Sequence, residues 1–153
     1  MRWEFRVHEQ ILTALRRLKG DVRWADIVIY HVGYQDPDLR RRKLDRDLRL
    51  LHMENEDRPD HPYTLFNLGQ VYEELGRTAE AITHLQRSLE PSDPADSIVR
   101  KLYVVLAQCH RKLGEWESAL SACRGGRRHY PDDIELLFEE AVVRSEKKDN
   151  EAK

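Results

Sequence analysis

Apolar residues recur every three or four positions through most of the chain, which is the spacing of one face of an amphipathic α-helix. Glycine and proline interrupt this pattern repeatedly between residues 36 and 150. The first helix of this part is expected at 38–56, because Asp36 and Pro37 are typical of a helix start. Its apolar face holds Leu39, Leu44, Leu48 and Leu51. The pattern therefore predicts several short helices joined by turns.

Two blocks in the second half of the chain repeat the same order of residues. In each block a helical pattern ends at Leu-Gly, and a second helical pattern containing a small residue follows it. The two turn glycines, Gly76 and Gly114, lie 38 positions apart. Residues 90–97 connect the blocks, and their two prolines exclude a continuing helix. Each block is therefore predicted to be a pair of helices.

These repeated residues resemble the signature of the tetratricopeptide family, whose period is about 34 residues. The first copy reads Leu65, Leu68, Gly69, Tyr72, Gly76, Ala81, Leu85, Ser88 and Pro94. The second copy reads Tyr103, Leu106, Ala107, His110, Gly114, Ala119, Cys123, Gly126 and Pro131. A third copy begins at Asp132 with Leu137 and Ala141. The resemblance implies a mainly α-helical solenoid of helix-turn-helix repeats in a right-handed superhelix, with two full repeats and one half at 62–150 and a capping helix and linker at 36–61.

The first 35 residues follow a different pattern. A helix is expected over 9–18, and the β-branched and aromatic run at 27–32 predicts a buried strand. One strand cannot form a sheet alone. Residues 1–35 are therefore interpreted as the end of an α/β unit whose other strands are absent.

Residues 2–49 resemble the C-terminal end of bacterial family 2 glycosyltransferases, in which a nucleotide-sugar-binding domain runs into tetratricopeptide repeats. The resemblance rests on Trp3-Glu4-Phe5-Arg6-Val7-His8-Glu9-Gln10-Ile11 and Val28-Ile29-Tyr30-His31-Val32-Gly33-Tyr34. It implies that this chain is the C-terminal part of a larger transferase. Such enzymes hold the donor with a divalent metal on an Asp-x-Asp motif at a strand end, which this chain lacks. We therefore expect no catalytic residue here, and the alternative is a catalytic glycosyltransferase of which this chain is the tail.

Charge and composition favour a protein partner. The net charge of −2 does not attract nucleic acid or an anionic membrane. No apolar run approaches the roughly 20 residues that span a bilayer. The basic run 40–43 is interpreted as a solvated helix surface balanced by Asp45 and Asp47. A cytoplasmic location is the expectation.

The sequence gives little support for a metal site or a cofactor site. Cys109 and Cys123 fall on apolar faces of expected helices, where thiols act as small buried hydrophobes. His8 and Glu9 begin like a zinc protease helix, but Leu12 stands where the second histidine is needed. No metal site and no cofactor are expected.

In a tetratricopeptide solenoid the first helices of successive repeats line a concave groove. The residues expected there are Tyr63, Phe66, Gln70, Glu73, Lys101, Val104, Gln108, Arg111, Phe138 and Val142. Phe66, Val104 and Phe138 would form an apolar strip, which usually marks a partner site, although a neighbouring domain or a second copy could cover it instead. The chain is thus predicted to be a protein- or peptide-binding scaffold module. The run Asp26–Val32 could also pair with its copy in a homodimer.

Overall fold

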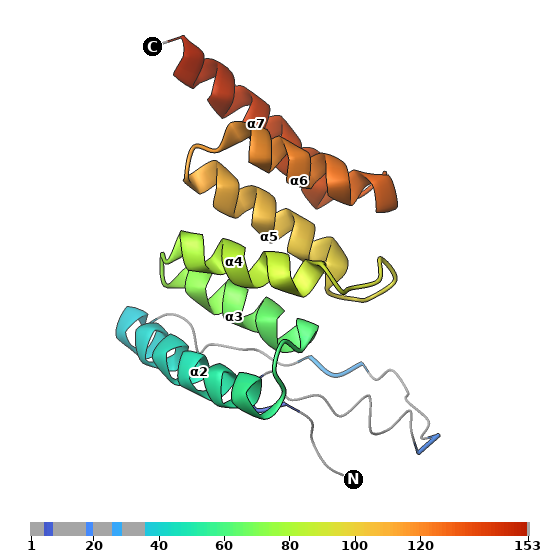
Figure 1. The fold of residues 1–153 in the computed structure, drawn as a ribbon. Coiled ribbons are helices and arrows are strands. Elements are labelled where there is room, and N and C mark those ends of the chain that lie inside the picture. The colour runs from blue at the N-terminus through green and yellow to red at the C-terminus, as the bar shows by residue number, and fades with distance from the viewer. Residues whose placement is uncertain (1–4, 8–17, 20–25, 29–35, 153) are drawn as a thin grey trace.

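The computed structural model describes residues 5–7, 18–19, 26–28 and 36–152. Helices make up most of this part, and no strand occurs among these residues. The helices are α2 (Pro37–Asp57), α3 (Pro62–Glu74), α4 (Thr78–Leu89), α5 (Val99–Lys112), α6 (Trp116–His129) and α7 (Ile134–Glu151). They stack in chain order, and Figure 1 shows them as a ladder that runs from α2 to α7. No described helix combines the length and the apolar character that a bilayer-spanning segment needs.

Local signals set where several helices begin and end. Asp36 Oδ1 accepts a hydrogen bond from the backbone N–H of Asp38 at 2.9 Å, and Pro37 lies in the first turn of α2. Gly76 and Gly114 follow α3 and α5 with φ of 75° and 73°, a conformation that glycine adopts without steric penalty. The predicted start of α2 and both predicted turn glycines are confirmed.

Small residues let neighbouring helices approach closely. A Cβ atom at Gly69 of α3 would lie 2.5 Å from Leu85 Cγ of α4. A Cβ atom at Gly126 of α6 would lie 2.8 Å from Leu136 Cδ1 of α7. Real Cβ atoms do not approach carbon this closely, so a larger residue at either position would force the neighbouring leucine, or the helix that carries it, to move.

One hydrophobic core runs through the first four described helices. It includes Leu51 of α2, Leu65 of α3, Leu85 of α4 and Leu102 of α5, all of which are buried. A smaller cluster joins α6 to α7 and contains Ala119, Leu120 and Val143. The core is therefore a thin layer that follows the stack of helices, as expected for a solenoid.

The two cysteines lie inside these layers. Cys109 and Cys123 are fully buried and form no disulfide. Burial raises the pKa of the Cys109 thiol to about 12 and that of Cys123 to about 11. Both thiols therefore stay protonated and unreactive at neutral pH, which confirms the prediction from their helical positions.

The third copy of the signature differs from the first two. Leu137 and Ala141 are exposed, whereas Leu136 and Val143 are fully buried. In α3 and α5 the equivalent signature positions face the second helix of the same repeat. Helix α7 is the last described helix, so it buries only the residues that meet α5 and α6.

The predicted N-terminal elements lie mostly outside the described residues. Asp26–Val28 belong to no strand, and Ile27 and Val28 are each 75% exposed. The prediction of a buried strand is therefore wrong for these three residues, because nothing in the described structure covers them. Leu18 lies in a turn, at the expected end of the first helix. The rest of the predicted helix and strand lies outside the described residues.

Candidate functional site

The predicted groove residues lie on α3, α5 and α7. Helix α5 packs against both α3 and α7, so the three helices form one row, and we call the ten predicted residues on this row the inner surface. On α3 these residues are Tyr63, Phe66, Gln70 and Glu73; on α5 they are Lys101, Val104, Gln108 and Arg111; on α7 they are Phe138 and Val142. The structure thus places all ten residues on neighbouring helices.

The apolar strip predicted on this surface is not continuous. Phe66 is 8% exposed and joins the core, and Val104 is 1% exposed. Phe138, in contrast, is 68% exposed. The prediction of an exposed strip is therefore wrong at Phe66 and Val104. A residue on the central helix α5 has a helix on either side, whereas Phe138 lies on the last described helix.

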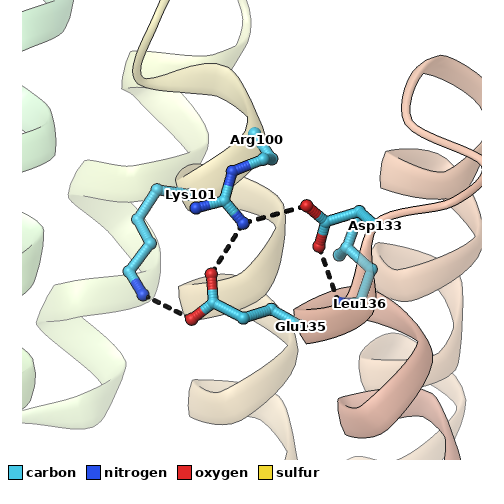
Figure 2. Close-up of polar contacts among 5 residues, drawn as sticks. All are labelled: Arg100, Lys101, Asp133, Glu135 and Leu136. Atoms are coloured by element: carbon cyan, nitrogen blue, oxygen red, sulfur yellow. Dashed lines mark hydrogen bonds and ion pairs between the residues drawn. The ribbon is translucent and has the colours of Figure 1, made fainter.

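Figure 2 shows how basic residues at the start of α5 are held by carboxylates at the start of α7. Arg100 Nη1 lies 3.0 Å from Asp133 Oδ2 and 2.6 Å from Glu135 Oε2. Lys101 Nζ donates to the other Glu135 oxygen at 2.9 Å. Asp133 also caps α7, because its Oδ1 accepts the backbone N–H of Leu136 at 3.0 Å. The bonds from Lys101 and Arg100 lower the pKa of Glu135, so this carboxylate stays charged.

A second ion-pair group lies near the end of α5. Arg111 Nε lies 2.6 Å from Glu139 Oε1, and Arg111 Nη1 lies 2.9 Å from Glu146 Oε1. Glu139 is only 4% exposed. Burial disfavours the charge of Arg111, but the bonds to the two glutamates outweigh this effect and raise its pKa. Arg111 therefore satisfies a buried carboxylate in its own chain.

The charged residues of the inner surface are all neutralised within the chain. Lys101 and Arg111 pair with carboxylates of α7. Glu73 of α3 pairs with Lys112 of α5. An incoming charged peptide would have to displace these partners, so the inner surface presents little free charge of either sign.

The α3 end of the inner surface is covered by the N-terminal segment of the chain. The ring of Phe5 lies 4.7 Å from that of Tyr63 and 5.3 Å from that of His61, measured between centroids. The backbone N–H of Arg6 donates to Glu54 Oε2 at 3.2 Å, and Val7 is buried in the core. One predicted groove residue, Tyr63, is thus already in contact with the chain itself.

The other candidate sites are a metal site and the basic run at 40–43. In the described part of the chain no group of three or more His, Cys, Asp or Glu residues could hold a metal ion. In the basic run of α2, Arg40 pairs with Glu74 at 2.8 Å and Arg41 lies 3.4 Å from Asp45. This run behaves as the predicted solvated helix surface with acidic neighbours.

Comparisons with known proteins agree with this geometry. Residues 62–90 match the tetratricopeptide repeat family. The structure is similar to the crystal structure of MamA, with a TM-score of 0.62 and 18% sequence identity. The fold is a tetratricopeptide solenoid. The similarity covers 78% of this chain and 66% of the MamA chain.

The first repeat of this solenoid is α3 with α4, the second is α5 with α6, and α7 begins the third. No curated protein shows significant sequence similarity to the chain.

Sequence reasoning missed two features close to the inner surface. The first is the burial of Glu139 and Glu140, which a single sequence would place at the surface. The repeat register could have predicted this burial, because Val105 and Leu106, which lie 34 positions earlier, are both buried. The second is the contact of Phe5 with α3, for which local sequence carries no signal.

Proposed function

We propose that the chain is a protein-interaction module whose partner packs on the open end of the inner surface. This end consists of Phe138 together with its exposed neighbours Ile134 and Leu137 on the same helix, and we call these three residues the α7 patch. These residues lie three and four positions apart and so share one face of the helix. Ile134 is 81% exposed and Phe138 is 68% exposed. Large apolar side chains gathered on a surface usually mark an interaction site, and this exposure is the observation that carries the proposal.

The surroundings of the patch indicate the chemistry of the partner. Lys101 and Arg111, the two basic residues of the inner surface, are already paired with glutamates of α7. A partner gains little by offering them carboxylates, because each new ion pair would break an existing one. The partner is therefore a protein segment with an apolar face, such as an amphipathic helix that lies along α7. Half-buried Val142 extends the same surface by one more turn.

An affinity-capture experiment with matched variants tests this proposal. The immobilised chain is compared with an Ile134→Ser/Phe138→Ser variant and with a Leu39→Ser control, which removes an exposed leucine from α2. The partner retained by the wild-type chain and the control should fall about tenfold with the double variant, the equivalent of about 1.4 kcal/mol. Equal retention by all three proteins would refute the assignment to α7.

The link to a glycosyltransferase is a separate proposal that rests on the resemblance of residues 2–49. Asp36 and Asp38, which carry the letters of an Asp-x-Asp motif, lie at the start of α2, and Asp36 caps that helix. We expect no saturable binding of manganese with uridine or guanosine diphosphate sugars tighter than about 1 mM in calorimetry. Such binding would instead favour the alternative that this chain takes part directly in sugar transfer.

Self-association through residues 26–32 is likewise a proposal. Ile27 and Val28 expose apolar side chains that a second copy could cover. Sedimentation at about 100 μM, above a micromolar dissociation constant, should show a dimer that Ile27→Lys shifts toward monomer. A wild-type chain that is monomeric at this concentration contradicts the idea.

A further inference from the structure

A pocket lies on the side of α5 that carries the second helices of the repeats. Helices α4 and α6 both pack on α5 but do not pack on each other. The space between them is a cavity of about 330 Å³. It lies at the lower end of the size range of small-molecule pockets in proteins. The pocket is built from three helices and contains none of the ten inner-surface residues.

The floor of the pocket is apolar and depends on a glycine. Leu89 of α4 and Tyr103 and Leu106 of α5 line it. Gly125 of α6 lies over the tyrosine ring, since a Cβ atom there would be 3.0 Å from Tyr103 Cε1. This close approach accounts for a glycine inside α6, where glycine costs about 1 kcal/mol relative to alanine.

The rim of the pocket is basic, and its two arginines form no ion pair among the described residues. Arg124 and Arg128 are exposed, line the pocket, and lie four positions apart on one face of α6. In the described structure neither guanidinium forms an ion pair, whereas Arg127 of the same helix is paired with Glu140. His110, also at the rim, already binds Glu115 through Nδ1 at 2.6 Å. The two unpaired arginines are therefore the charges that face the opening.

We propose that this pocket binds a small carboxylic acid with an apolar body. The body lies against Leu89, Tyr103 and Leu106, and the carboxylate accepts hydrogen bonds from Arg124 and Arg128. Arginine guanidinium groups bind carboxylates in a planar, often bidentate geometry. The arrangement selects for both parts of the ligand, because the floor carries no charge and none of the residues that line the pocket is acidic.

Three probes separate these two requirements. The first is 3-phenylpropionate, which carries a ring and a carboxylate; the second is 3-phenylpropanamide, its uncharged analogue; the third is acetate, which lacks the ring. Each is titrated into the ¹⁵N-labelled chain, and backbone amide shifts of Ser121, Ala122 and Gly125 are followed. We expect saturable shifts with 3-phenylpropionate at a dissociation constant near 1 mM, and binding at least about tenfold weaker for the other two.

Matched variants identify the arginines. Arg124→Gln/Arg128→Gln should weaken 3-phenylpropionate binding about tenfold or more, because both charge-assisted contacts are lost. Arg49→Gln removes an exposed arginine from α2 and should leave binding unchanged. Three outcomes overturn the proposal: no saturable shift up to about 10 mM, equal binding of the amide, or unchanged binding by the double variant.

Discussion

Helices α3 and α4 form the first repeat through close apolar packing, with Gly69 against Leu85 and both residues buried. Helix α7 also packs closely on α6, with Gly126 against Leu136, but it adds a second kind of contact. Its buried surface includes Glu139 and Glu140, which pair with arginines of the neighbouring helices. The first repeat thus depends on shape, whereas the junction of α7 depends on shape and on satisfied charge.

The repeat register shows how these two solutions are related. Val105 and Leu106 of α5 occupy the positions that Glu139 and Glu140 occupy in α7, 34 residues later. A buried ion pair gives little net stability compared with packed apolar residues, but removing one partner is costly. The two ends of the solenoid should therefore respond differently to substitution, and the following experiments measure the difference.

The largest effect is expected from Arg111→Ala. It leaves Glu139 buried without its guanidinium partner, which should lower the free energy of unfolding by about 3–5 kcal/mol in urea denaturation. The double variant Arg111→Ala/Glu139→Val should recover most of this loss, because valine is the residue of the equivalent position in α5. A double variant as unstable as the single one would show that the pairing is not the cause.

A smaller loss is expected from overpacking the apolar junction of α5 and α6. Ala119 is fully buried, and Ala119→Leu should cost about 1–3 kcal/mol because the added atoms have no space. Ala141→Leu is the matched control: Ala141 is exposed on α7, and its substitution should change stability by less than about 0.5 kcal/mol. Equal melting temperatures for the two variants would contradict the observed helix register.

The two ends should also differ in their response to pH. Burial lowers the pKa of His61 and of His84 in the first repeat. The charge of Arg58 adds to this effect at His61, and the charge of Arg87 adds to it at His84. As pH falls, these histidines are protonated in the unfolded state before they are protonated in the folded state. The stability that the neutral histidines contribute is therefore complete above about pH 6.5 and is lost as pH falls below this value. Glu135 at α7 has a lowered pKa, so its contribution is lost only further into acid, below about pH 4.5.

Urea denaturation between pH 7.5 and pH 4 checks this order. Replacing both histidines by asparagine should flatten the loss of stability between pH 6.5 and pH 5, and Glu135→Gln should change only the part below it. A wild-type stability that is constant between pH 7.5 and pH 5 would contradict the histidine assignment.

The smallest effect is expected at the exposed end of the inner surface. Phe138→Ser should change the free energy of unfolding by no more than about 0.5 kcal/mol, since the ring is already in water. Phe66→Ser, at the equivalent helical position of the first repeat, is the control and should destabilise the chain clearly more. Similar thermal melts for the two variants would show that Phe138 is packed.

Much of the solenoid could be predicted from local signals. A turn glycine, an aspartate before a proline and apolar spacing each act over a few residues, so α2 and the helix ends at Gly76 and Gly114 follow from the sequence. The buried thiols follow in the same way. These features depend on the backbone of one helix or one turn.

The inner surface was harder to predict, because exposure there depends on neighbours far along the chain. The repeat pattern assigns Phe66, Val104 and Phe138 to equivalent positions, but the first two are covered and the third is not. From the sequence alone, Glu139 is expected at the surface, because the sequence does not show that Arg111 faces it. The same limit applies to the pocket between α4 and α6, whose walls come from three helices.

Asp133 gives the start of α7 an unusual kinetic property. One of its carboxylate oxygens closes the first turn of the helix at Leu136, and the other holds Arg100 of α5. Fraying of the first turn breaks the cap and disturbs the contact with Arg100, so amide protons near Leu136 should exchange slowly with deuterium, as those in a helix interior do. The final turn of α7 has no such double anchor, and its amides should exchange within the earliest time points.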